Sequence, residues 1–206
     1  MKNFAELASS DSVLTATKNL EDNGFIVRTV ETKEEAMEAI KSLIPKGSSV
    51  MNGASTTLNQ IGFLEYLKSG DHGWNNLHAN ILAEQDKEKQ NKLRKESVLS
   101  DYYLGSAHAV TETGEVLVAS NTGSQLPHLA FTSTHIILVV STKKIAKNLD
   151  EAMKRIDEYV VPLEDQRMKS VGYPGTMYSK LLILKKENKM MGREFVIVFV
   201  NEDLGF

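Results

Sequence analysis

The pattern of apolar and polar positions predicts helices and strands that alternate along most of the chain. Asp11 begins one helical pattern, the capping pair Thr32 and Glu35 begins a second, and Asn148 begins a third that Pro162 ends. Runs of β-branched and aromatic residues predict the strands between them. These strands cover residues 25–30, 48–51, 102–104, 107–110, 116–119, 136–140, 181–184 and 195–200.

Residues 74–97 predict a single long helix whose second half is rich in charged residues. A charged helix face of this kind is usually solvated, and we favour that interpretation. An arm that grips a partner subunit is the alternative, because Leu77, Ile81 and Leu82 give the start of the helix an apolar side.

The alternation of helices and strands predicts an α/β fold with a mostly parallel sheet that is covered on both faces. The two late strands, 181–184 and 195–200, suggest an antiparallel edge. We find no internal repeat and no long linker, so residues 1–206 are expected to form a single domain. Residues 1–46 would supply its N-terminal helices and strand, and residues 74–97 an insertion or arm.

Composition excludes several kinds of chemistry. The 24 basic and 27 acidic residues give a net charge of −3, which argues against a general nucleic-acid binder. The absence of cysteine excludes disulfides, thiolate zinc sites and an iron–sulfur cluster held by this chain, and it fits a cytoplasmic protein. No signal peptide and no membrane-spanning run is visible, and the histidines lack metal-binding spacing, so no metal site is expected.

The first candidate site is the loop from Asn52 to Thr57, which follows a strand and begins a helix. The first N–H groups of a helix lack partners and attract anions, and Gly53 would allow close approach of a ligand. Ser55, Thr56 and Thr57 add hydroxyl groups. Simple helix capping is the alternative explanation for these residues.

Two further segments have the composition of a site. Glu112, followed by Thr113 and Gly114, comes just after a predicted strand, where a carboxylate can act as a general base or a nucleophile. An ordinary tight turn explains the same residues, and the sequence favours the turn. The loop 121–127 contains Gly123, around which backbone N–H groups can bind an anion, but a surface loop is equally consistent with it. Its candidate ligand-binding residues are Asn121, Thr122, Gly123 and Gln125.

Taken together, these segments resemble the LUD-domain family of lactate-utilisation proteins. The resemblance is carried by residues 48–63, by 101–127, in which SAHAVTETG is similar to the family's S-A-N-A-I-T-E-x-G segment, by 135–163 and by the closing EDLGF. It implies a Rossmann-like fold similar to that of ribose-phosphate isomerases and CoA transferases, in which a loop corresponding to residues 53–57 often holds phosphate.

This chain departs from the family at two positions. His108 stands where the family often has asparagine, and Gln125 where it often has arginine. The loss of an arginine removes a bidentate contact to an anion. This difference puts in doubt that the chain binds the same anionic ligand as the family.

The resemblance implies an accessory or ligand-binding subunit that works beside an iron–sulfur oxidoreductase in converting L-lactate to pyruvate. Two alternatives use the same strand-end pocket. One is a stand-alone enzyme acting on a phosphorylated, CoA-linked or folate-like molecule, with Glu112 as the reactive carboxylate, and the other is a sensor that binds such a molecule without chemistry. An anionic small molecule is the expected ligand, a homodimer is possible, and whether the chain is an enzyme stays open.

Overall fold

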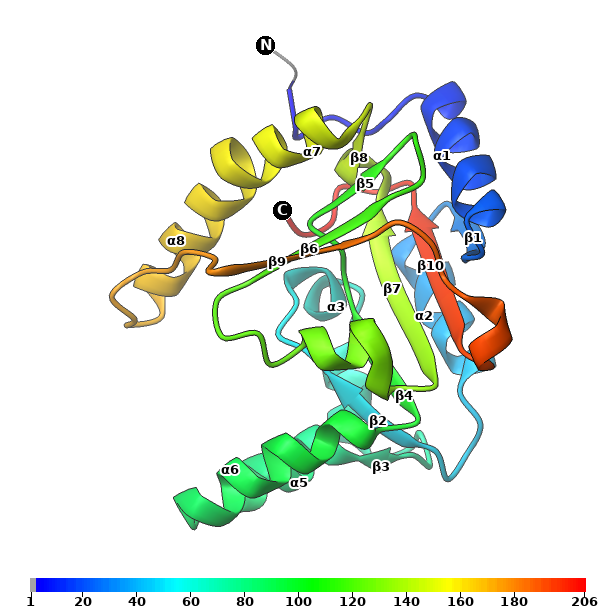
Figure 1. Ribbon diagram of the computed structural model, residues 1–206. Coiled ribbons are helices and arrows are strands. Elements are labelled where there is room, and N and C mark those ends of the chain that lie inside the picture. Colours follow the sequence, from blue (N-terminus) through cyan, green and yellow to red (C-terminus); the bar gives the residue numbers. More distant parts are fainter. Residues whose placement is uncertain (1–2) are drawn as a thin grey trace.

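The computed structural model, which describes residues 3–206, contains a six-stranded sheet whose pairings are all parallel (Figure 1). From one edge to the other, its strands are β1 (Ile26–Val30), β10 (Glu194–Val200), β7 (His135–Ser141), β4 (Tyr102–Gly105), β2 (Ser49–Asn52) and β3 (Asn75–Asn76). The predicted α/β class with a mostly parallel sheet is therefore confirmed.

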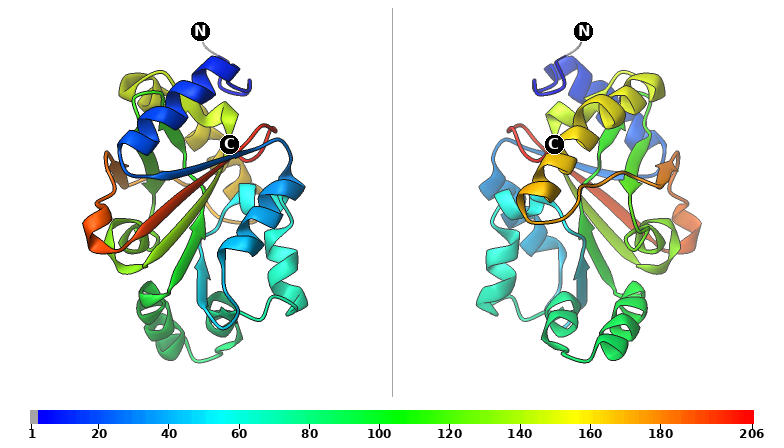
Figure 2. Two further views of the ribbon diagram at one scale, coloured as in Figure 1. Left: turned by 90° about the vertical axis from the view of Figure 1, so that its right-hand side faces the viewer. Right: turned by 90° about the vertical axis from the view of Figure 1, so that its left-hand side faces the viewer.

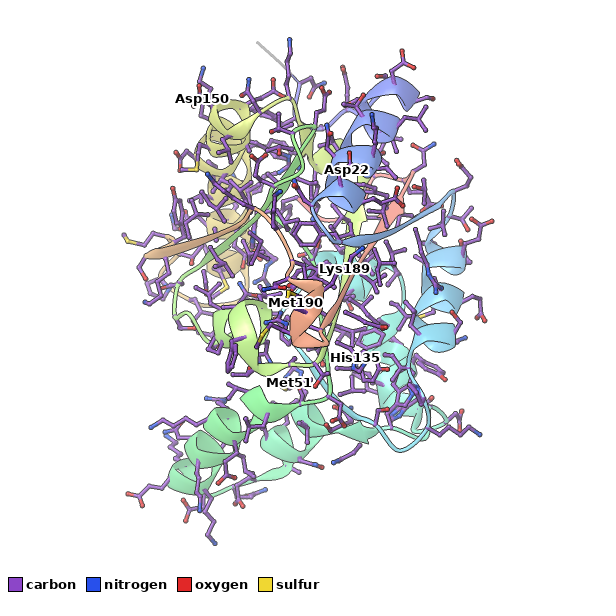
Figure 3. The ribbon with its side chains drawn as sticks, turned by 45° about the vertical axis from the view of Figure 1, so that its right-hand side comes forward. Asp22, Met51, His135, Asp150, Lys189 and Met190 are labelled. Carbon is purple, nitrogen blue, oxygen red and sulfur yellow. The ribbon has the colours of Figure 1, made fainter. Side chains whose placement is uncertain are left out.

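A second, four-stranded sheet contains the antiparallel pairings. Its order is β8 (Ile145–Ala146), β5 (Ala109–Thr111), β6 (Val116–Ser120) and β9 (Lys180–Leu184). The last two strands do not pair with each other, because β9 joins β6 whereas β10 lies between β1 and β7. Lys189 and Met190, labelled in Figure 3, lie on the short 3-10 turn (Lys189–Met191) that connects them.

The helices begin where capping side chains predict. Thr32 accepts the backbone N–H of Glu35 at 3.2 Å, and Asn148 accepts that of Glu151 at 3.0 Å. The first helix starts one residue earlier than Asp11, with Ser9 as its N-cap. The main helices are α1 (Ser10–Asp22), α2 (Lys33–Leu43), α3 (Thr56–Gln60), α4 (Phe63–Ser69), α5 (Leu77–Ala83), α6 (Lys87–Glu96), α7 (Leu149–Arg155) and α8 (Val161–Ser170).

Both faces of the parallel sheet are covered, but by different layers (Figure 2). Helices α2, α3 and α4 pack on one face around Trp74. The other face packs against α1, the small sheet and a π-helical turn, His128–Thr132. Helix α7 covers the outer side of the small sheet. Strands buried on both sides are continuous apolar runs, as in β10.

The prediction of one helix over residues 74–97 is wrong. The segment forms β3 and then two helices, α5 and α6, with a break at residues 84–86. Asp86 caps α6 by accepting the N–H groups of Glu88 and Lys89, and Asn76 caps α5. Capping side chains of this kind favour a new helix start over a continuous helix. Helix α6 buries none of its residues.

Pro162 does not end the helix that begins after Asn148, contrary to the sequence prediction. A π-helical turn, Ile156–Val160, connects α7 directly to α8, and Pro162 lies in the first turn of α8. Proline is tolerated there because its missing N–H is not needed in a first turn and the π turn changes the local hydrogen-bond register. Within residues 3–206, no helix is both long and apolar enough to cross a membrane.

Candidate functional site

A cavity of about 660 Å³ lies beyond the carboxyl ends of the parallel strands. Asn52 lines it from the end of β2, Ser106 from the chain after β4, Lys144 from the turn after β7, and Phe206 from the segment after β10. The loop after β6, one side of α8 and residues 176–178 also line it. Ligands of open α/β sheets bind at this edge, where strands from distant parts of the sequence end together.

Most of the residues that the sequence suggested as ligand-binding groups line this cavity. They are Asn52, Gly53, Ser55, Thr56, Thr57, Asn121, Thr122 and Gln125. Two segments that are far apart in sequence, 52–57 and 121–125, are therefore brought to the same cavity.

Glu112, Thr113, Gly114 and Gly123 are not among the lining residues. The Glu112 carboxylate accepts a hydrogen bond from Ser12 Oγ at 2.5 Å. The backbone carbonyl of Glu112 accepts one from Asn19 Nδ2 at 2.6 Å. Both partners belong to α1, which packs on the turn between β5 and β6. Glu112 thus holds α1 on that turn, which is the tight connection that the sequence favoured.

Replacing Glu112 with alanine is expected to lower the free energy of unfolding by about 1–2 kcal/mol without changing ligand affinity at the cavity. The lost contact is a hydrogen bond to a charged group, which contributes about 1.5–3 kcal/mol, and partial exposure of this contact places it at the lower end. Urea unfolding and calorimetric titration of the same variant would measure both quantities. A loss of ligand affinity without a loss of stability would show instead that Glu112 takes part in ligand binding.

Local geometry explains two of the lining residues without a ligand. Ser55 caps α3 by accepting the N–H of Leu58 at 3.2 Å. An added Cβ at Gly53 would approach Tyr103 Oη more closely than the 3.0 Å that real Cβ atoms keep. Gly53 is therefore required by the packing of Tyr103, and α3, with 5 residues, is too short to have a strong dipole.

Lys144 is the main feature of the cavity that the sequence analysis missed. Its side chain is 3% exposed, and its Nζ lies 3.1 Å from Thr57 Oγ1, 3.1 Å from Ser106 Oγ and 3.3 Å from the carbonyl of Ala107. All three partners are neutral oxygens. A basic residue just after the buried strand 136–140 was the signal in the sequence, because such strand ends form sites in parallel sheets.

The neighbours of Lys144 are also cationic. Burial lowers the pKa of Lys144 well below its ordinary value, and the charges of Arg155 and Lys143 lower it further. Arg155 is fully buried and donates from Nη1 to the carbonyl of His108 at 2.9 Å. Its guanidinium lies over the Tyr159 ring, and its Nε and Nη2 have no hydrogen-bond partner among the described residues. Lys143 pairs with Asp203. The three side chains form a basic group, of which Lys144 lines the cavity.

His108 also lines the cavity, near Lys144 and Arg155. Its Nδ1 accepts the backbone N–H of Ala119 at 3.2 Å, which places the ring proton of the neutral form on Nε2. Burial, together with the charges of Lys144 and Arg155, lowers the pKa of His108 to about 3. The imidazole is therefore neutral at pH 7, with its Nε2–H as the hydrogen-bond donor.

Arg167, which also lines the cavity, has a compensated charge. Arg167 on α8 donates to both carboxylate oxygens of Glu164, each at 2.6 Å. His78 contacts Asn52 Oδ1 at 3.2 Å, and burial lowers the pKa of His78.

Across residues 3–206, no group of three or more His, Asp and Glu side chains is placed to hold a metal ion.

A Rossmann-like parallel sheet with a polar cavity at its strand ends defines an α/β protein of the class that places its sites at this edge. A family model, the LUD domain, matches residues 14–200, and the chain belongs to that family. The family's name refers to lactate utilisation. The family prediction is thus confirmed.

One solved structure supports the same fold. A DUF162 family protein from Deinococcus radiodurans is 14% identical to this chain, with a TM-score of 0.56, and the match covers 95% of this chain and 99% of that one. No curated protein matches the sequence.

Proposed function

We propose that this LUD-domain protein is the ligand-binding subunit of a system that oxidises L-lactate to pyruvate, and that its strand-end cavity holds a small-molecule anion. The observation that carries the proposal is Lys144, which lines the cavity with neutral oxygens as its hydrogen-bond partners and has the basic side chains of Lys143 and Arg155 near it. Buried charges are costly unless they are paired, and a bound anion would compensate these.

The rest of the cavity offers donors to such an anion. Thr57, Ser106 and His108 come from two segments, one after β2 and one after β4, and line the same cavity. This arrangement compensates for Gln125, whose side chain is engaged by Ala119 and Tyr103 and carries no charge.

The proposed partner is an iron–sulfur oxidoreductase subunit in the cytoplasm. This chain contains no cysteine and cannot itself bind a cluster through thiolates. A division of labour between a redox subunit and a ligand-binding subunit accounts for that composition.

Replacing Lys144 with glutamine is expected to weaken anion binding at least tenfold, which corresponds to about 1.4 kcal/mol. Isothermal titration calorimetry would compare lactate, pyruvate, phosphate, sugar phosphates and CoA esters with the wild-type protein and the variant. Lys147→Gln is the matched control, because Lys147 is exposed and lies three residues further along the chain, after β8. Equal affinities of the two variants for the best ligand would contradict the proposal.

Cavity size favours a second candidate function. Drug-sized ligands occupy cavities of about 300–1,000 Å³, and lactate is much smaller than the 660 Å³ available here. A phosphorylated, CoA-linked or folate-like molecule would use this space, either as a substrate or as a sensed ligand. In the same titrations, selective binding of one of these larger molecules, with no binding of lactate or pyruvate, would favour this function over the first.

A further inference from the structure

The amino group of Lys144 is buried among groups that belong to the wall of the cavity. Its three oxygen partners belong to Thr57, Ser106 and Ala107, and an added Cβ at Gly205 would lie 2.8 Å from Nζ. All four residues line the cavity. The groups around Nζ are thus the same groups that a bound ligand would meet.

The two neighbouring lysines differ in their partners. Lys143 Nζ is paired with Asp203 and donates to the carbonyl of Gly205 at 2.6 Å, which holds it as a structural ammonium group. The Lys144 amino group has hydroxyls at two of its three contacts. Hydroxyls can donate as well as accept, so they accommodate Lys144 as a neutral amine or as an ammonium group.

The surroundings of Lys144 favour the neutral amine. Burial and the nearby charges of Arg155 and Lys143 all lower its pKa. Desolvation and an adjacent cation are the two ways in which proteins convert lysine into a nucleophile for carbonyl carbons.

We propose that Lys144 is a nucleophilic amine that forms a Schiff base with a 2-oxo carboxylate bound in the strand-end cavity. This inference rests on the proposed anion-binding function and names the ligand class of the same site. The nearby positive charges of Arg155 and Lys143 attract the ligand's carboxylate, while the carbonyl carbon meets Nζ.

The reaction needs no oxidant or further reactant. The lone pair of Nζ forms a bond to the carbonyl carbon, the carbonyl π electrons move to oxygen, and a proton passes from nitrogen to that oxygen to give a carbinolamine. Loss of the hydroxyl group as water, with uptake of one proton, leaves a protonated imine. The Ser106 and Thr57 hydroxyls, each 3.1 Å from Nζ, are placed to pass these protons.

The test is chemical trapping with pyruvate and sodium borohydride on the full chain. Borohydride reduces the imine to a stable secondary amine, which intact-mass measurement detects and peptide mapping assigns to one residue. We expect one adduct per chain, located at Lys144, in the wild-type protein and in Lys147→Gln, and at least a tenfold lower yield in Lys144→Arg. Arginine keeps a long basic side chain but lacks the nucleophilic amine.

The outcomes separate this inference from the proposed function. Calorimetric binding of pyruvate without an adduct would overturn the Schiff base and leave the anion site standing. Neither binding nor an adduct would overturn both. An adduct distributed over surface lysines, with no preference for Lys144, would also overturn the inference, and mapping on the wild-type chain decides this even if Lys144→Arg fails to fold.

Discussion

Acidification from about pH 6.5 to pH 5 is expected to lower the free energy of unfolding by roughly 1–2 kcal/mol per pH unit. Burial lowers the pKa of His128 to about 4, and burial with nearby cations lowers that of His108 to about 3. An unfolded histidine binds its proton near pH 6.5, so over this range the unfolded chain holds more protons than the folded one. Each proton that only the unfolded chain binds lowers the free energy of unfolding by up to about 1.4 kcal/mol per pH unit. His108 contributes less than this maximum, because its ring contacts the cavity.

Urea unfolding at several pH values between about 7 and 5 would measure this slope. His108→Asn removes one titrating group while its amide oxygen can still accept the N–H of Ala119, so the slope should become shallower. His128 is 2% exposed and contacts Ser100 and Ser133, which makes it the stronger contributor. A wild-type stability that does not change over this range would show that both rings are solvated.

Replacing Gly53 with alanine is expected to lower the free energy of unfolding by about 1–3 kcal/mol through overpacking. The new methyl group would overlap Tyr103 Oη and lie 3.2 Å from Gln125 Oε1. The Tyr103 ring cannot retreat, because it is 1% exposed and stacked on His128 with ring centroids 4.3 Å apart. Thermal or urea unfolding would measure the loss.

The double variant Gly53→Ala/Tyr103→Phe separates packing from ligand binding. Without the hydroxyl, the nearest ring carbon lies 3.6 Å from the added methyl group, which is ordinary contact. We therefore expect the double variant to be about as stable as Tyr103→Phe alone, with a favourable coupling of about 1–2 kcal/mol between the two sites. Strict additivity of the two single losses would show that Gly53 is needed for another reason.

Much of the secondary structure could be predicted from the sequence because its signals are local. The caps at Thr32 and Asn148 act within three residues of their partners, and the apolar run 136–140 matches a strand buried on both faces. Where local signals compete, prediction failed. Asp86 began a new helix inside an apparently continuous one, and a π turn carried the chain through Pro162.

For the candidate site, too, only some of the residues could be predicted from the sequence. Segments 52–57 and 121–125 could be identified because small and hydroxyl-bearing residues follow strands. Glu112 has the same local signal as a strand-end carboxylate, but α1 packs against it and uses it as a hydrogen-bond acceptor. No local pattern distinguishes these two outcomes, since Ser12 and Glu112 are 100 residues apart in the sequence.

The sequence by itself determined the α/β class, most strands and helix starts, the absence of thiol chemistry and the membership of the LUD-domain family. Only the tertiary structure decided which side chains share the cavity. Lys144 reaches Thr57 across 87 residues and Ser106 across 38, because the strand order brings the ends of β2, β4 and β7 side by side. Periodicity and capping extend over a few residues, whereas the depressed pKa of Lys144 arises from burial and from charges that the fold brings near it.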